Sequence, residues 1–399
     1  MREPLILRCK NNHLPYDIVL NILGRLPVKS VARFRCVCKS WDSSITTPYF
    51  ISTHLNHNNK DPYEDGNGYI IHMASWKARR VISFSTSMSS PSPPSLPPKT
   101  SICTVAYGHT FDKIFEIEIP FDFSSNCTQM VGSCNGLLCL ADSNNVIYLW
   151  NPSIRKFKKL PHTCLGNLNN VTLGFAYCSE NNDYKVVMTS HSFLSTYEIG
   201  IYTLSSDSWR RIEMLLRSNI KFYDNNYFLP IPLVSGALHW MAGFIEEEEK
   251  HCSEMIVCFY VNCEKFRNLE MPDGSMTVPS FQICLASFKG KLAVITYRES
   301  EHYYQYTIWV MREYGVNESS HKLFVLPFGR RVAICIGFTE NGSLLICGRN
   351  DQLENKKYKF VLVDTETLLE KDSDIQHASC VGTFMESLAL LDGANMVSY

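Results

Sequence analysis

Few residues in this chain have the types and spacing that metal binding requires. The densest cluster of metal-ligating side chains is His251-Cys252 with Cys258 and Cys263, which has neither C-x-x-C nor paired-histidine spacing. On an alternating strand its members would point to different faces. Cys36-Val37-Cys38 is also too closely spaced for a zinc site, and buried helix faces explain it better. We therefore expect no metal site and no cofactor.

Paired carboxylates would be needed for a glycan-acting enzyme. Such an enzyme holds two acids roughly 5–10 Å apart, and Glu116 and Glu118 share one face of a predicted strand. Like charges at that spacing are more typical of a solvated face, and Asp142, Asp207 and Asp364 have the sequence context of turns. The G-x-G-x-x-G, P-loop, H-E-x-x-H and G-x-S-x-G motifs do not occur. The sequence thus predicts no catalytic residues, with a glycan-acting enzyme as a weaker alternative.

The composition is that of a globular protein. Of 399 residues, 45% are hydrophobic and 19% charged, and the formal net charge of −1 does not favour nucleic acid as a partner. The apolar runs are too short to span a bilayer, and the patch Pro4–Leu7 is too short for a signal-peptide core. The 16 cysteines are scattered singly, as in a reducing compartment. We expect a protein of the cytoplasm or nucleus that binds no membrane.

The first region that must position functional residues is helical. Between Leu14 and Trp41, apolar residues recur three and four apart in two stripes separated by Pro27, which predicts two amphipathic helices. Pro15 suits a first helical turn, and Pro48 opens a further short helix. So short a piece cannot bury both stripes alone, which is typical of a docking module; the alternative is a helical hairpin packed on the rest of the protein. The stripes are Ile18, Ile22 and Leu26, with Val19 and Leu23 beside them, and Val31, Phe34, Val37, Cys38 and Trp41.

This helical region resembles an F-box, the motif that connects a substrate receptor to a cullin–RING ubiquitin ligase through an adaptor subunit. Asn21 departs from the family pattern, which usually has an acidic residue there, and Val31-Ala32 replaces a more leucine-rich pair. Both departures leave the apolar pattern intact. The matching residues are Leu14-Pro15, Ile22-Leu23, Leu26-Pro27-Val28-Lys29-Ser30, Phe34-Arg35, Val37-Cys38-Lys39 and Trp41.

The resemblance implies that the helical stripes bind the adaptor. Large apolar anchors dominate such interfaces, so Trp41 and the leucines are the expected hot spots. The predicted adaptor-binding residues are Leu14, Pro15, Ile22, Leu23, Leu26, Pro27, Val31, Phe34, Val37, Cys38 and Trp41.

From Tyr69 onward, short β-like runs alternate with Gly, Asn, Asp, Ser and Pro. Three stretches are alike, because each begins with a glycine-led apolar strand and closes on Leu-Pro or Met-Pro. A period of roughly 40–55 residues with about four strands per unit is typical of a β-propeller, and an irregular pair of β-sandwiches is the alternative. We predict about six blades, with Gly382–Leu391 completing the first. The units are Gly136–Pro161, Gly236–Pro272 and Gly290–Pro327, with weaker ones at Tyr69–Pro120, Gly200–Ile212 and Glu340–Thr367.

This β region resembles the plant F-box-associated domain, which in that family recognises the substrate. Together the two resemblances imply a small helical F-box domain at residues 8–55, a linker at 56–68, and a mainly-β, propeller-like domain at 69–399. Departures fall at Tyr260 and Ser320-His321 and affect single blades. The resembling segments are Gly132–Leu140, Trp150–Pro161, Leu173–Val187, Ile201–Ile212, Gly236–Met241 and Thr307–Met311.

The implied function is a non-catalytic substrate-recognition subunit of an SCF-type cullin–RING ubiquitin ligase. Such a subunit binds the adaptor, and through it the cullin and RING proteins, and holds a protein target near the conjugating enzyme. The alternative is a scaffold that binds the adaptor without promoting ubiquitination. Trp76, Tyr223–Phe228 and His302–Tyr306 mix aromatic and polar residues as recognition loops do, although strand-flanking tyrosines explain each segment better. The sequence does not single out the residues that bind the target.

Overall fold

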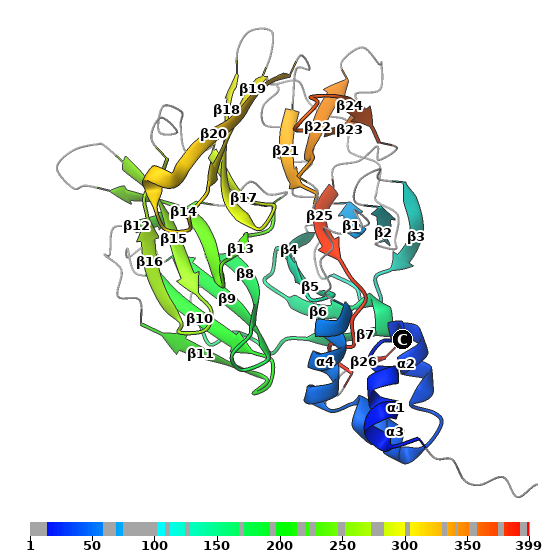
Figure 1. The fold of residues 1–399 in the computed structure, drawn as a ribbon. Coiled ribbons are helices and arrows are strands. Elements are labelled where there is room, and N and C mark those ends of the chain that lie inside the picture. Colours follow the sequence, from blue (N-terminus) through cyan, green and yellow to red (C-terminus); the bar gives the residue numbers. More distant parts are fainter. Residues whose placement is uncertain are drawn as a thin grey trace, which may run out of the picture.

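In the described part of the chain, four α-helices precede six antiparallel sheets that are arranged in a ring, so the predicted propeller with about six blades is confirmed (Figure 1). No helix in the described part of the chain is long and apolar enough to cross a membrane. The structure, a computed structural model, describes residues 14–58, 69–74, 102–107, 112–123, 128–166, 171–191, 197–213, 220–223, 229–245, 252–272, 283–299, 304–328, 333–339, 342–350, 357–373, 379–391 and 397–398.

The helical unit differs from the two predicted helices in one respect. The second apolar stripe is divided between two short helices, because Cys38 between them is extended (φ −160°, ψ 161°). Pro15 and Pro27 each directly precede a helix, where a missing N–H costs no hydrogen bond. The last helix begins at Pro48 as predicted, but continues into the predicted linker 56–68. The helices are α1 (Tyr16–Leu23), α2 (Val28–Phe34), α3 (Lys39–Ile45) and α4 (Pro48–Asn58).

Each sheet of the ring is one blade. Blade 1 contains β25 (Ser379–Phe384), β1 (Tyr69–Ala74), β2 (Ile102–Tyr107) and β3 (Lys113–Glu118). Blade 2 contains β4 (Thr128–Cys134), β5 (Leu137–Asp142), β6 (Ile147–Asn151), β7 (Lys156–Lys159) and β26 (Val397–Ser398). Blade 3 contains β8 (Thr172–Cys178), β9 (Asp183–His191), β10 (Tyr197–Thr203) and β11 (Ser208–Ile212).

The other three blades follow in chain order. Blade 4 contains β12 (Ile220–Phe222), β13 (Leu233–Val234), β14 (Ala237–Ile245), β15 (Cys252–Tyr260) and β16 (Lys265–Leu269). Blade 5 contains β17 (Ile283–Phe288), β18 (Lys291–Glu299), β19 (Tyr304–Met311) and β20 (Ser320–Phe328). Blade 6 contains β21 (Ala333–Phe338), β22 (Leu344–Asn350), β23 (Lys357–Val363) and β24 (Glu370–Asp372).

The ring is closed by a strand from the C-terminal part of the chain. β25 pairs antiparallel with β1, with Ile71 opposite Gly382, so blade 1 combines the first and nearly the last strand. Strands of neighbouring blades contact one another all the way round, in the order β25, β4, β8, β14, β17, β21 and back to β25. The prediction that the C-terminal run completes blade 1 is therefore right for Gly382–Phe384, whereas the rest of that run has another role.

The hydrophobic core lies between blades, since a lone four-stranded sheet cannot cover its own two faces. Trp150 is fully buried in the cluster shared by blades 1 and 2, and Trp240 in the cluster shared by blades 3 and 4. Ion pairs also join neighbours: the buried Lys158 of blade 2 lies 2.7 Å from Asp207 of blade 3. Lys185 of blade 3 lies 2.8 Å from Glu264 of blade 4. Each blade is thus stabilised by the next one.

The leading glycine of each of the three stronger predicted repeats occupies a tight turn. Gly136, Gly236 and Gly290 have φ of +74°, +73° and +73°, and each follows a residue whose φ is also positive. Two-residue turns with two positive φ values suit the twist of a β-hairpin and favour glycine at the second position. These turns join β4 to β5, β13 to β14 and β17 to β18. The sequence repeat therefore begins at the second strand of a blade.

Candidate functional site

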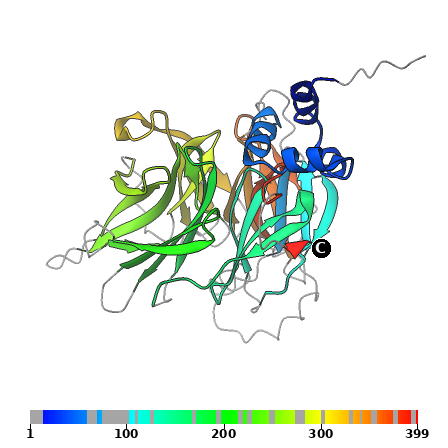
Figure 2. The same cartoon turned by 90° about the horizontal axis from the view of Figure 1, so that it is seen from below.

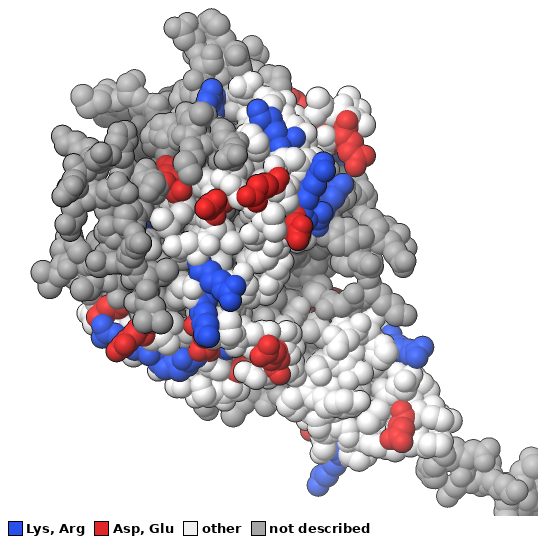
Figure 3. Space-filling model, turned by 60° about the vertical axis from the view of Figure 1, so that its left-hand side comes forward, with Lys and Arg blue, Asp and Glu red and all other residues white. Residues whose placement is uncertain are grey.

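An exposed apolar stripe runs along α1. Leu14 is 58% exposed, and Ile18 and Ile22 are each 47% exposed, although all three are large aliphatic residues. Ile18 and Ile22 are four residues apart, so they lie on one face of α1, and Leu14 lies just before the helix begins. Charged residues are sparse on the part of the helical unit that Figure 3 shows, whereas both signs are interspersed over the propeller. An exposed apolar stripe of this kind is typical of a protein–protein interface.

The exposed stripe continues onto the segment between α2 and α3. Val37 is 58% exposed, and Cys38 is also exposed. The Tyr16 hydroxyl donates a hydrogen bond of 2.9 Å to the carbonyl of Ser40, which places the start of α1 beside the start of α3. Five residues of the predicted adaptor-binding set lie in or beside this stripe and are exposed, and we call them the exposed adaptor face: Leu14, Pro15, Ile22, Val37 and Cys38.

The other predicted adaptor-binding residues lie deeper. Leu23 and Val31 are buried, Leu26 and Phe34 are half-buried, and Trp41 packs edge-to-face on Phe34 with ring centroids 5.7 Å apart. Pro27 is exposed at the start of α2. The structure thus divides the predicted set: one group faces solvent, and the other holds the helices together.

Residues far away in sequence complete the core of the helical unit. Leu388 and Leu391 are 1% and 4% exposed and pack with Leu23, Val31 and Phe50. They belong to Met385–Leu391, which follows β25 and which we call the strap. Helical periodicity predicts which faces are apolar but not what covers them, so these two leucines escaped the sequence analysis.

The strap is held by a buried asparagine of blade 2. The side-chain amide of Asn151, which is fully buried, donates to the carbonyls of Ser387 (3.0 Å) and Ala389 (2.8 Å). Its oxygen accepts a bond from the backbone N–H of Ser153 in η1 (Pro152–Ile154). α2 contacts η1 directly, and Figure 2 shows the helices gathered against one side of the propeller. The adaptor face is therefore carried by a unit that is packed on the propeller.

The candidate metal and thiol sites have simple structural explanations. Cys258 is buried, and its thiol donates to the carbonyl of Arg267, while Cys263 is exposed in a turn. His251 lies outside the described residues. Within those residues no group of three or more His, Cys, Asp or Glu side chains could hold a metal ion. The expectation that Cys36-Val37-Cys38 lies on buried helix faces is wrong, because both cysteines are exposed and Cys38 is extended between α2 and α3. The hydroxyl of Ser40, 3.2 Å from the thiol of Cys38, lowers the pKa of that exposed cysteine.

The candidate carboxylates are dispersed, and three of them serve as turn residues, as predicted. Asp142 accepts backbone N–H bonds from Asn144 and Val146, and Asp364 accepts two such bonds in the turn before β24. These bonds lower the pKa of Asp364. Asp207 has a positive φ of 48° in the turn between β10 and β11. Glu116 is exposed on the outer strand β3, where it pairs with Lys113.

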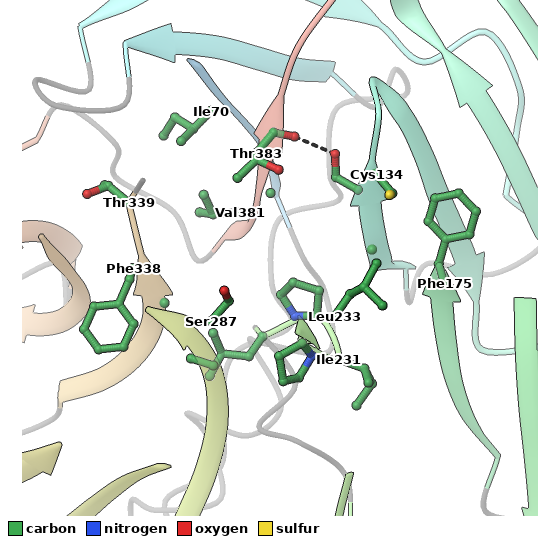
Figure 4. Close-up of a pocket in the computed structure, with 18 of the residues that line it drawn as sticks. Ile70, Cys134, Phe175, Ile231, Leu233, Ser287, Phe338, Thr339, Val381 and Thr383 are labelled. Carbon is green, nitrogen blue, oxygen red and sulfur yellow. Dashed lines mark hydrogen bonds between the residues drawn. The ribbon is translucent and has the colours of Figure 1, made fainter. Parts of the chain in front are cut away.

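The central channel contains a hollow of about 410 Å³ (Figure 4). It is lined by side chains from most of the blades, including Ile70, Ser287, Phe338 and Val381. The described residues that line it include no Asp or Glu. Of the segments that we considered as recognition loops, Trp76, residues 224–228 and residues 302–303 lie outside the described residues.

Comparison with protein families gives two matches that together span most of the chain. Residues 79–380 match the family described as F-box associated beta propeller domain. Residues 12–53 match the F-box domain. The second match covers α1, α2 and α3 and most of α4, and the first covers most of the propeller.

Curated relatives from Arabidopsis thaliana are similar over most of their length. One F-box protein is 28% identical, over 77% of this chain and 70% of the relative. An F-box/kelch-repeat protein is 26% identical, over 79% of this chain and 80% of the relative. The F-box protein CPR1 is 25% identical, over 78% of this chain and 73% of the relative. Similarity to solved structures, such as a fungal alcohol oxidase (TM-score 0.35, 9% identity, 70% of this chain and 59% of that one), is too loose to bear on function.

Proposed function

This chain belongs to the F-box associated β-propeller family, as a plant F-box protein, and from that premise we propose that it is a substrate receptor of an SCF-type ubiquitin ligase. The F-box implies binding to the adaptor and through it to a cullin complex, and a propeller-type domain beside it fits recognition of a protein target. The observation that carries the proposal is the exposed adaptor face, because it leaves large aliphatic residues in water with nothing in the described chain covering them.

The receptor role needs no reactive group from this chain. The RING protein and the conjugating enzyme carry out ubiquitin transfer, and the receptor raises the effective concentration of target lysines near them. The relatives are F-box proteins, which fits a non-catalytic subunit. A glycan-acting enzyme would need paired acids at the channel, and the described lining residues supply none. We also propose that the protein acts in the cytoplasm or nucleus, where its free cysteines would stay reduced.

We expect Ile22→Asp to weaken binding to the adaptor by at least ~30-fold, because it places an unpaired carboxylate in the centre of an apolar interface. Ile22 is largely exposed in the free chain, so the substitution should leave the melting temperature nearly unchanged. The measurement is the Kd of the full chain for recombinant adaptor by titration calorimetry. Leu26→Arg or Trp41→Ala would be less clean tests, since both side chains also pack within the helical unit.

Tyr49→Asp is the matched control, because Tyr49 is an 80% exposed aromatic residue on α4 outside the predicted adaptor set. It should bind the adaptor like the wild type. Equal affinities for Ile22→Asp and the wild type would contradict the proposal. Reconstitution with the cullin, the RING protein and the conjugating enzyme separates the two alternatives: a receptor becomes ubiquitinated in the complex, whereas a scaffold binds the adaptor and remains unmodified.

A further inference from the structure

The hollow in the central channel lies at the end where the innermost strands of several blades turn back. Its lining includes Asn135 and Gly290, which belong to the tight turns after β4 and β17, and Met385, which follows β25. Figure 4 shows labelled side chains from several blades surrounding one open space. Its volume of about 410 Å³ falls within the ~300–1,000 Å³ that is typical of sites for small molecules.

Most of the wall is apolar and chemically inert. Ile231, Leu233, Phe338 and Val381 are half-buried, so each presents part of its side chain to the hollow. Cys134 also lines it, and burial raises the pKa of this thiol to about 12. The thiol is therefore neutral near pH 7 and contributes to the apolar wall rather than acting as a nucleophile.

Two hydroxyl groups, on blades 5 and 1, remain available for hydrogen bonding. Ser287 on β17 and Thr383 on β25 are both exposed toward the hollow, and within the described residues their hydroxyls have no hydrogen-bond partner. Other hydroxyls at the lining are occupied: Ser133 donates to the carbonyl of Thr383, and the Thr339 hydroxyl bonds with Ser343. The hollow thus offers two free donors or acceptors inside an otherwise apolar wall.

One lysine residue lines the hollow. Lys289, in the turn after β17, is the only charged residue among the described residues that line the hollow. Its ammonium is 3.4 Å from the carboxylate of Glu366, whose side chain is 81% exposed. The ammonium also lies 5.6 Å from the centroid of the Phe288 ring, which does not line the hollow. A solvent-exposed ion pair contributes little, so the side chain can change rotamer and bring its ammonium to an anion in the hollow at small cost.

We propose that this hollow binds a small, mainly apolar carboxylic acid. The apolar body fills the space between Ile231, Phe338 and Val381, the carboxylate lies at Lys289, and the hydroxyls of Ser287 and Thr383 orient the molecule. A built site of this kind has an apolar wall with a few convergent polar groups. The proposal goes beyond the role as a ubiquitin-ligase receptor and does not depend on it, because it rests on the channel alone.

The test uses naphthoate as the anionic compound and naphthalenemethanol as its neutral counterpart, titrated into the full chain by calorimetry. We expect saturable one-to-one binding of naphthoate and roughly tenfold weaker binding of the alcohol, since the charge-assisted bond to Lys289 is lost. Lys289→Gln should weaken the binding of naphthoate by a similar factor and leave the binding of the alcohol unchanged. Lys371→Gln, an exposed lysine on the outer strand β24, is the matched control and should bind both compounds like the wild type.

Ser287→Phe should abolish binding of both compounds, because the new ring fills the hollow. Ser287 is an exposed position on a strand, where phenylalanine is well tolerated, and an unchanged melting temperature would verify the fold. Absence of saturable naphthoate binding, or binding that Ser287→Phe leaves intact, would overturn the proposal. Equal affinities for the acid and the alcohol would overturn the assignment of a carboxylate. If the channel accepts only a side chain of a protein target, neither compound will bind, and that result would also contradict the proposal.

Discussion

At the scale of single residues, a buried histidine joins two blades. His239 on β14 of blade 4 is fully buried, and its Nε2 lies 2.8 Å from the hydroxyl of Tyr314, which follows β19 of blade 5. Its Nδ1 lies 3.3 Å from the carbonyl of Pro232, which can only accept, so the proton is on Nδ1 and Tyr314 donates to Nε2. Burial lowers the pKa of His239 to about 4. The ring is therefore neutral near pH 7.

This histidine should make the propeller less stable in acid. The unfolded chain has a histidine pKa of about 6.5, so the contribution of the neutral ring is complete above pH 6.5 and is lost as the pH falls toward 4. We expect His239 alone to account for a decrease on the order of 3 kcal/mol in the free energy of unfolding across that range. Because carboxylates also titrate there, the measurement is the difference between the wild type and His239→Gln in urea unfolding at several pH values. The exposed His162→Gln should retain the wild-type pH dependence, and parallel curves for wild type and His239→Gln would contradict this assignment.

The residue types in the sequence pointed to the candidate site, but they did not show which of its side chains are exposed. The F-box pattern placed Leu14, Leu23, Val31 and Val37 in one adaptor-binding set, and the structure finds Leu14 and Val37 exposed but Leu23 and Val31 buried. A helix has the same apolar period whether its stripe meets a partner protein or its own chain. Leu23 and Val31 are buried by packing among the helices and by the strap, which is distant in sequence.

At the scale of elements, the turns that begin each repeat differ in what surrounds them. Gly136 and Gly236 share the same backbone conformation, but a Cβ at Gly136 would lie 2.4 Å from the carbonyl oxygen of Met385, whereas no described residue lies within 4 Å of one at Gly236. We expect Gly236→Ala to cost about 1–2 kcal/mol, the strain of a positive φ. Gly136→Ala should cost a further ~1–3 kcal/mol, since it also displaces the strap. Urea unfolding of both variants measures the difference, and equal losses would show that the strap does not press on this turn.

Strands were easier to predict than helices in this chain. β6 and β18 lie within the predicted units Gly136–Pro161 and Gly290–Pro327, and β19 contains the segment Thr307–Met311. Strands buried on both faces are short apolar segments with turn residues at each end, which makes them recognisable in the sequence. The prediction that the second apolar stripe forms a single helix was wrong. Apolar spacing continues through Cys38, but the backbone is extended there, and periodicity does not record backbone breaks that lack a proline or glycine.

At the scale of the whole molecule, the strap joins the helical unit to the propeller. Leu388 and Leu391 lie in the core of the helical unit, while the segment that carries them directly follows β25, the strand that closes the propeller ring. Asn151 and Lys156 of blade 2 bind its backbone carbonyls. The exposed adaptor face and the propeller are therefore packed as one body, which would fix the direction in which a bound target is held relative to the ligase.

The strap can be tested by removing its two apolar anchors. We expect Leu388→Ser with Leu391→Ser to raise the hydrogen-exchange rates of the core amides of α1 to α4 by about a hundredfold or more, because each buried leucine contributes ~2–5 kcal/mol. Amides of β14 and β18, on the far side of the ring, should remain protected, since β25 still pairs with β1. Val397→Ser, which changes a 50% exposed residue of the C-terminal strand β26, is the control and should alter neither region. Unchanged exchange in the helices would show that the F-box is stable without the strap, and loss of protection in every blade would show that the strap instead holds the ring closed.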